Sequence, residues 1–242
     1  MKVAILLSGQ PRNYHKGYEE IKKAYLDRYD CDVFFHTWDD DSFKATQFFH
    51  DRPANEYNME GGWKEELVNL YYPKKHIFEK PIIFDEKNIV DPLWRQPLQN
   101  TMGMYYSIYQ AFTLTAPGYD CYIRSRFDLM FEPATLELEK LDLNDFHVWN
   151  WATDERVKHR GYYDVFGVGS YDAMGIYSTV FSRIPWYLNA DQDYRVFLQG
   201  GWPGQDSPLR NEYLLRWHLT QGGLNVVEHE TTIPNADGQI IR

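Results

Sequence analysis

Long apolar runs are missing from this chain of 242 residues. No stretch approaches the ~18 consecutive apolar residues that a membrane-spanning helix needs. The apolar run at residues 3–7 is shorter than the hydrophobic region of a signal peptide, and Gln10, Pro11 and Arg12 follow soon after it. The sequence therefore predicts a soluble protein of the cytoplasm with no membrane span.

Cysteine and positive charge are also scarce. The two cysteines, Cys31 and Cys121, each fall in a predicted buried strand, which indicates reduced core residues and excludes a disulfide framework. The 25 Lys and Arg residues stand against 35 Asp and Glu, so the formal net charge is −10. Because a nucleic-acid partner needs a basic footprint, this charge argues against one. A few local arginines can still bind a small anion.

Several motifs of well-known sites are absent. The sequence has no G-x-G-x-x-G and no G-K-[ST], which excludes the dinucleotide fingerprint and the P-loop. It has no G-x-S-x-G and no clustered Cys/His spacing, so a serine nucleophile elbow and a structural zinc site are unsupported. Aromatic residues, in contrast, make up 17% of the chain, with 19 Tyr and 8 Trp, so the interior or a binding cleft must contain many rings with polar groups.

The order of the predicted elements indicates an α/β fold. Residues 2–7 are a continuous apolar run typical of a strand buried on both faces, residues 15–29 have helical spacing, and residues 32–38 form the next strand. Further helices are predicted at 63–71, 97–116, 171–183 (after Ser170 as N-cap) and 207–220, strands at 76–84, 119–131, 146–151, 163–169 and 224–229, and loops at 39–62 and 191–204. We expect a single domain over 1–242, with a Rossmann-like mixed central sheet flanked by helices. A nucleotide-type half at 1–131 is followed by a mixed half at 132–242.

The predicted strand at 119–131 carries the most informative side chains. Side chains at alternate positions of a strand share a face, so Arg124, Arg126 and Asp128 should point the same way. Two guanidiniums beside a carboxylate suit a diphosphate and a divalent cation, because Arg binds phosphate oxygens in a fork and Asp holds hard cations. A solvated sheet face or a local Arg–Asp ion pair would give the same pattern.

Two further segments supply candidate ligand-binding residues. Ser8, Gly9, Gln10 and Arg12 directly follow the first strand, where ligands bind in open α/β sheets. An ordinary tight turn is the alternative, but a turn needs neither Gln10 nor Arg12. Asn100 lies near a helix start, together with Thr101, and Ser107 follows farther along. A helix start favours anions, but capping is the favoured role for Asn100 or Thr101 taken alone.

Three carboxylates are candidates for a general base. Asp164 begins a predicted apolar strand, where it could face a cleft or end a turn. Asp206 lies at a helix entrance and could act as its N-cap. Glu212 lies four residues before Arg216, so an ion pair along the helix is the plainer interpretation.

Taken in order, the motifs resemble a group of bacterial and large-virus glycosyltransferases with the GT-A fold. The lipopolysaccharide-synthesis transferases of the WavE type and the glycan-synthesis transferases of chlorella viruses look similar. The segments that carry the resemblance span most of the chain: AILLSGQPRN, DVFFHTW, QNTMGMYYSIYQA, YDCYIRSRFDLMF, VFGVGSYDAMGIYS and SPLRNEYLLRWHL.

The resemblance implies an enzyme that moves a sugar from a nucleotide-sugar donor to a hydroxyl of a glycan acceptor, in the host cytoplasm if the chain is viral. The first half would bind the donor and the second half the acceptor. Asp128 would occupy the place of the D-x-D motif and hold Mg²⁺ or Mn²⁺. Positions 126 and 130 are Arg and Met, so the second Asp is missing, and Arg124 and Arg126 could instead neutralise the diphosphate. A catalytically inactive nucleotide-sugar or carbohydrate binding module is the alternative.

Overall fold

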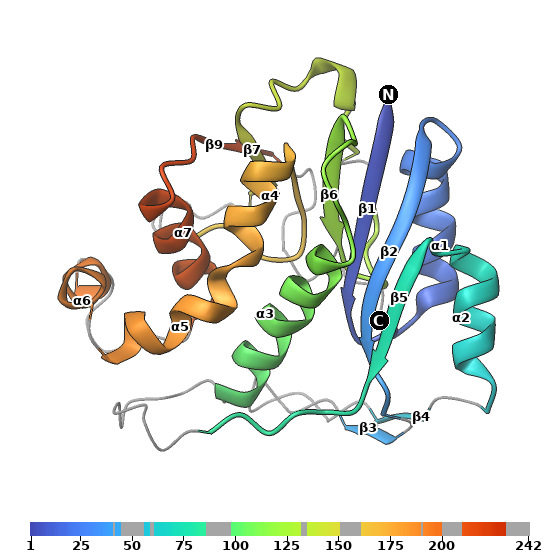
Figure 1. The fold of residues 1–242 in the computed structure, drawn as a ribbon, viewed down its shortest axis with the longest axis horizontal. Coiled ribbons are helices and arrows are strands. Elements are labelled where there is room, and N and C mark those ends of the chain that lie inside the picture. Colours follow the sequence, from blue (N-terminus) through green and yellow to red (C-terminus); the bar gives the residue numbers. More distant parts are fainter. Residues whose placement is uncertain are drawn as a thin grey trace.

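The computed structural model describes residues 1–40, 42–44, 56–58, 61–85, 98–131, 135–150, 161–189, 191–199 and 210–230. Within these ranges, seven strands form one sheet in the order β5-β2-β1-β6-β8-β7-β9 (Figure 1). Strands β1 (Lys2–Gly9), β2 (Asp30–Trp38), β5 (Lys75–Glu79) and β6 (Cys121–Ser125) are parallel. Strand β8 (Gly167–Gly169) is antiparallel to both β6 and β7 (Phe146–Trp149), and β7 is parallel to β9 (Val226–His229). The predicted mixed α/β sheet is confirmed.

Helices cover both faces of the sheet (Figure 1). Helix α1 (Tyr14–Ile21), its π-helical continuation (Lys22–Leu26) and α2 (Trp63–Tyr71) pack on one face. Helices α3 (Leu98–Thr113), α4 (Tyr171–Ser178), α5 (Val180–Asn189) and α7 (Asn211–Gln221) pack on the other. The remaining described elements are α6 (Gln192–Gln199), the short 3₁₀ helix Leu138–Lys140, and a two-stranded antiparallel ribbon of β3 (Ser42–Lys44) and β4 (Glu56–Asn58).

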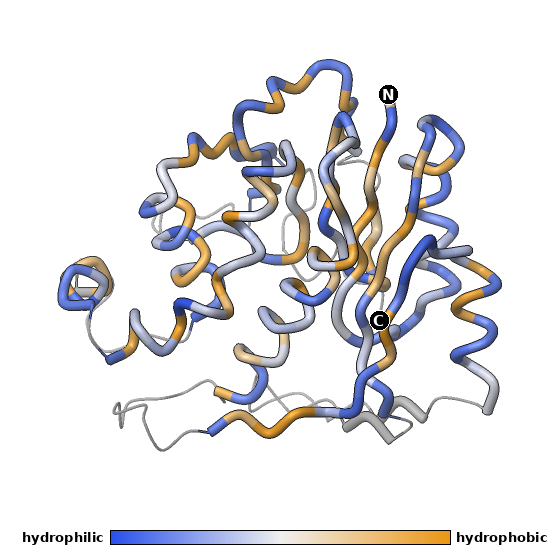
Figure 2. Tube along the Cα trace, viewed as in Figure 1, coloured by the Kyte–Doolittle hydropathy of each residue, from blue (hydrophilic) through white to orange (hydrophobic). Residues whose placement is uncertain are grey.

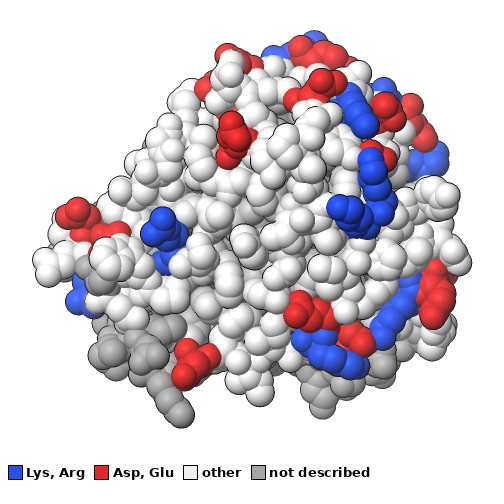
Figure 3. All heavy atoms as spheres, viewed as in Figure 1, with Lys and Arg blue, Asp and Glu red and all other residues white. Residues whose placement is uncertain are grey.

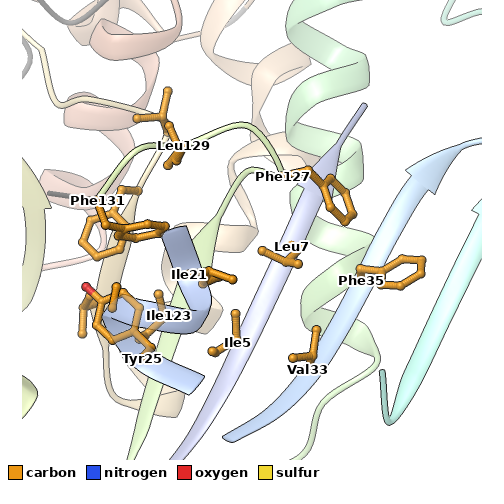
Figure 4. Close-up of a cluster of buried hydrophobic side chains, with 14 of the residues drawn as sticks. Ile5, Leu7, Ile21, Tyr25, Val33, Phe35, Ile123, Phe127, Leu129 and Phe131 are labelled. Atoms are coloured by element: carbon orange, nitrogen blue, oxygen red, sulfur yellow. The ribbon is translucent and has the colours of Figure 1, made fainter. Parts of the chain in front are cut away.

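The alternation of side chains along the central strands produces two cores. Ile5 and Ile123 pack with α1 and α2, whereas Leu6 and Tyr122 pack with α3 and α4. Figure 4 shows part of the first core, and Figure 2 shows that hydrophobic residues concentrate on the central strands. A strand buried on both faces needs apolar residues at successive positions, which explains the unbroken run of β1.

Several element boundaries differ from the predicted ones. The strand predicted at 119–131 ends at Ser125, and a turn follows at Phe127 and Asp128. The backbone of α1 lies against this turn: a Cβ on Gly17 would lie 1.6 Å from the Phe127 carbonyl oxygen. The strand predicted at 163–169 is reduced to β8, so Asp164 lies in a turn. The loop predicted at 191–204 is wrong over α6, which begins at Gln192.

Other expectations hold. Helix α2 covers the predicted 63–71, and Ser170 accepts a hydrogen bond from the Ala173 N–H as the N-cap of α4. Among the described residues, no helix is long and apolar enough to cross a membrane. Residues of both predicted halves join in the same sheet, because β6 of the first half pairs with β8 of the second. The separate binding roles of the two halves stay a prediction.

Candidate functional site

The carboxyl ends of β1, β2, β5 and β6 lie at one edge of the sheet (Figure 1). From β1 the chain proceeds outward to β2 and β5, and it then returns to place β6 on the other side of β1. In open α/β sheets, ligands bind at such a reversal, beyond the carboxyl ends of the strands. The residues that follow β1 and β6 are therefore the ones placed to meet a ligand.

Arg126 and Asp128 form a two-pronged ion pair directly after β6. Arg126 Nε donates to Asp128 Oδ1 at 2.7 Å, and Arg126 Nη2 donates to Oδ2 at 2.8 Å. From the loop after β1, Arg12 Nε lies 3.8 Å from the same Oδ2. Burial disfavours the Arg126 cation, but the adjacent Asp128 carboxylate outweighs this effect and raises the pKa of Arg126. The expected gathering of Arg126 and Asp128 is observed, in the form of a local ion pair.

The same geometry bears on the expected Mg²⁺ or Mn²⁺ ion. Both oxygens of Asp128 are hydrogen-bonded to Arg126, and the Asp128 side chain is only 1% exposed. Across the described part of the chain, no three His, Cys, Asp or Glu side chains gather in a group that could hold a metal. This arrangement does not fit a metal ligand, and the ion stays a prediction.

Arg124 lies deeper in the same edge of the sheet and is buried, with 2% exposure. Its Nη1 donates a hydrogen bond to the carbonyl oxygen of Asp164, which also accepts one from the Tyr177 hydroxyl at 3.1 Å. Its Nε is buried and has no hydrogen-bond partner within the described ranges. Arg124 thus holds the Asp164 turn in place and retains one unused donor.

Buried Asp164 and half-buried Glu212 form a pair of interacting acids beside these arginines. Burial raises the pKa of Asp164, while the charges of Arg124 and Arg126 and a hydrogen bond from the Asn211 side chain oppose that rise. Burial and the charge of Asp164 raise the pKa of Glu212 to about 7. Two carboxyl groups with displaced pKa values are typical of general acid–base sites.

Asn211 is the functional neighbour that the sequence did not indicate. Its Oδ1 accepts from the Thr101 hydroxyl at 3.0 Å, and its backbone carbonyl accepts from the Tyr105 hydroxyl at 2.7 Å. Helix α3 therefore fixes the start of α7, and with it Glu212. An Asn that holds a helix start against another helix has the same appearance in sequence as an exposed one, so no local pattern marks this role.

The loop after β1 contributes both expected and unexpected features. Ser8 is buried, and its hydroxyl has no hydrogen-bond partner in the part of the chain that the structure describes. Gly9 has a positive φ of 101°, a conformation that favours glycine. Its N–H donates to the Ser107 hydroxyl at 2.8 Å, so it is committed to the protein. Gln10 is half-buried and Arg12 reaches toward Asp128.

Two candidates stay outside this constellation. Asn100 lies in the first turn of α3, and its binding role stays a prediction. Asp206 lies outside the described residues. On the face seen in Figure 3, basic side chains lie among acidic ones.

Comparisons with known proteins add little. No protein-family model matches the chain, and no curated protein matches it. Nineteen chains of solved structures are similar. One is the nucleoside-diphosphate-sugar pyrophosphorylase from Vibrio cholerae RC9, which is 12% identical, with 95% of this chain and 91% of that chain covered and a TM-score of 0.39. A likeness this weak carries no argument, so function has to be argued from the geometry.

Proposed function

We propose that this protein is a glycosyltransferase that moves a sugar from a nucleoside-diphosphate donor to a hydroxyl of a glycan acceptor. The observation that supports the proposal most is the grouping of Arg124 and Arg126 with the interacting acids Asp164 and Glu212 at the carboxyl end of β6. Cations are needed where a diphosphate leaves, and a base is needed where a hydroxyl attacks. The two kinds of group lie next to each other here.

The arginines would act on the leaving group. When the bond between the sugar and the diphosphate breaks, negative charge grows on the phosphate oxygens. Guanidiniums fixed in a buried site stabilise that charge more than they stabilise the ground state. Arg124 offers an Nε that has no hydrogen-bond partner among the described residues, and Arg126 is held in orientation by Asp128. Arg12 would add a third cation from the loop after β1.

Glu212 is the better candidate for the base. A pKa of about 7 makes it a stronger base than an ordinary carboxylate while leaving a large part of it ionised near neutral pH. In an inverting reaction it would take the proton of the acceptor hydroxyl as that oxygen attacks the anomeric carbon. Asp164, which contributes to the raised pKa of Glu212, would tune this base.

The sequence resemblance to GT-A-fold transferases of the WavE and chlorella-virus kind agrees with this proposal, whereas the missing second Asp departs from their D-x-D motif. Because Asp128 is held by Arg126, we propose that the arginines neutralise the diphosphate without a metal. The substrates would then be a nucleotide sugar and an oligosaccharide or glycan, and the enzyme would work in the cytoplasm.

The test has two stages. Thermal shift against UDP, GDP, dTDP and CMP should identify a nucleotide that stabilises the protein. Release of that nucleotide from its sugar conjugates should then be measured with and without a mixed glycan acceptor pool. Acceptor-dependent release supports the transferase. Binding without release, whatever divalent metal is added, would favour the inactive binding module, and no binding at all would refute both.

A further inference from the structure

A chain of hydrogen bonds below the loop after β1 connects four elements. The Gly9 N–H donates to Ser107 Oγ at 2.8 Å, and Ser107 Oγ lies 2.8 Å from His36 Nδ1. His36 Nε2 lies 2.9 Å from Glu79 Oε2, and the Tyr106 hydroxyl donates to Glu79 Oε1 at 3.1 Å. Ser107 and Tyr106 belong to α3, whereas His36 lies near the end of β2 and Glu79 ends β5.

The direction of each bond follows from the groups involved. Glu79 as a carboxylate only accepts, so the neutral His36 ring carries its proton on Nε2 and accepts at Nδ1. Burial lowers the pKa of His36, although Glu79 opposes this, and the lowered pKa favours the neutral ring. The Ser107 hydroxyl then donates to His36 Nδ1, which leaves an oxygen lone pair for the Gly9 N–H. Each group thus donates toward Glu79: Gly9 to Ser107, Ser107 to His36, and His36 to Glu79.

This connectivity matches that of a Ser-His-Glu nucleophile, but the geometry excludes that role. Ser107 and His36 are both 0% exposed, and Ser107 lies in the middle of α3. A substrate carbon cannot approach such an oxygen. The last donor of the hydrogen-bond chain is the Gly9 N–H, and Gly9, with its positive φ, leads to Gln10 and Arg12.

We propose that Ser107, oriented by His36 and Glu79, is a positioning residue that holds the loop at residues 8–12 in the conformation that meets an anionic ligand. The inference deepens the proposed function, on which its ligand rests. It also gives Gly9 a role other than the ligand contact predicted from the sequence. Its N–H anchors the loop to α3, so phosphate contacts fall to side chains such as Arg12. The chain of hydrogen bonds continues from Ser107 through His36, which explains why a fully buried histidine lies beside the site.

Ser107→Ala tests the anchor, and Ser178→Ala is its matched control. Ser178 is also 0% exposed in a helix, and its hydroxyl has no hydrogen-bond partner among the described residues. Amide hydrogen exchange of residues 8–13, measured by NMR, should speed up about tenfold in Ser107→Ala, the factor expected for one lost hydrogen bond. It should stay unchanged in Ser178→Ala.

Substitutions of His36 separate orientation from mere packing. Asn places an amide oxygen close to the position of Nδ1, so His36→Asn should keep loop exchange near wild type. His36→Phe keeps a ring but removes both nitrogens. The Ser107 hydroxyl must then turn to the residue 36 carbonyl, now 3.3 Å away, and exchange should rise by an intermediate factor.

Affinity for UDP, GDP or dTDP, whichever binds wild type, should fall about tenfold in Ser107→Ala and stay constant in Ser178→Ala. Unchanged loop exchange in Ser107→Ala overturns the inference whether or not a nucleotide binds. Faster exchange with unchanged affinity also overturns it, because the anchored loop would then not serve the site. If wild type binds none of UDP, GDP, dTDP and CMP, the proposed function fails, and the exchange data alone decide whether Ser107 holds the loop.

Discussion

Arg126 holds both carboxylate oxygens of Asp128 at 2.7 and 2.8 Å, across a turn that follows directly after a strand. Asp128 is almost completely buried, whereas Arg126 keeps 21% of its side chain exposed. Asp128 is therefore enclosed by the protein, whereas part of the Arg126 side chain is accessible from outside.

Breaking this ion pair should cost stability as well as activity. Arg126→Ala leaves a buried carboxylate that has lost its forked partner, so the free energy of unfolding should fall by about 3–5 kcal/mol. Denaturant unfolding measures this loss, and nucleotide release measures the expected loss of turnover. Lys140→Ala is the matched control, because its 2.9 Å pair with Glu137 is mostly exposed and should contribute less than about 1 kcal/mol. Equal effects of the two substitutions would contradict the assignment.

Chelation of divalent metals should change neither nucleotide affinity nor turnover. With Asp128 occupied by Arg126, we expect nucleotide affinity and turnover to be the same in EDTA and in millimolar Mg²⁺ or Mn²⁺. Isothermal titration and the release assay provide the measurements. Activity that disappears in EDTA and returns with a metal would mean that Arg126 releases Asp128 when the donor binds.

The pH profile of turnover should have an ascending limb that depends on Glu212. As a base it must lose its proton, so turnover should rise as the pH passes through about 7. Glu212→Gln should lower turnover by about 10²–10⁴-fold, the usual contribution of a positioned base. A flat profile between pH 5.5 and 8.5, or near-normal turnover in the variant, would rule out this role.

The ionisation of Glu212 should also make stability depend on pH, but stability should fall over the pH range in which turnover rises. The folded protein binds the Glu212 proton more tightly than the unfolded chain does, because the pKa is raised from 4.5 to about 7. This stabilising contribution is complete below about pH 4.5 and is lost as the pH rises to about 7. At pH 8 we therefore expect Glu212→Gln to unfold with a free energy about 1–3 kcal/mol above that of wild type. A variant that is less stable than wild type at pH 8 would contradict the buried-acid assignment.

Gly17→Ala should disturb the turn that carries Asp128. The new Cβ would lie 1.6 Å from the Phe127 carbonyl oxygen, so α1 or the turn must shift. We expect a loss of about 2–4 kcal/mol in unfolding free energy, in the range of strongly overpacked sites. Gly61→Ala is the control, because nothing lies within 4 Å of its added Cβ. A stabilised Gly17→Ala variant would contradict the tight packing of Gly17 against the Phe127 carbonyl.

Sequence reasoning performed well where periodicity is strong. The apolar run of β1, the helix α2 and the N-cap Ser170 follow from local rules that tertiary structure does not override. It performed less well after residue 125. The period-2 pattern continues through Phe127, Leu129 and Phe131, and these side chains enter the same core as Ile123, but the backbone turns instead of extending.

The candidate site shows the same division. Arg126 and Asp128 are close in sequence, so their meeting could be foreseen, although the strand geometry offered as the reason was wrong. The Asp164–Glu212 pair and the Ser107–His36 contact join residues 48 and 71 positions apart. Only the packing of α3 and α7 against the sheet brings such residues together, and no local pattern records that packing.

The pairing of β6 with β8 has a consequence for how the molecule is made. While the first 131 residues are being synthesised, the outer edge of β6 has no neighbour, and Arg124 lacks the carbonyl that it later contacts. An unpaired strand edge of this kind invites association with other chains. The nascent protein therefore passes through a stage in which it is prone to association, and this stage ends only when the segment around Gly167 leaves the ribosome and pairs with β6.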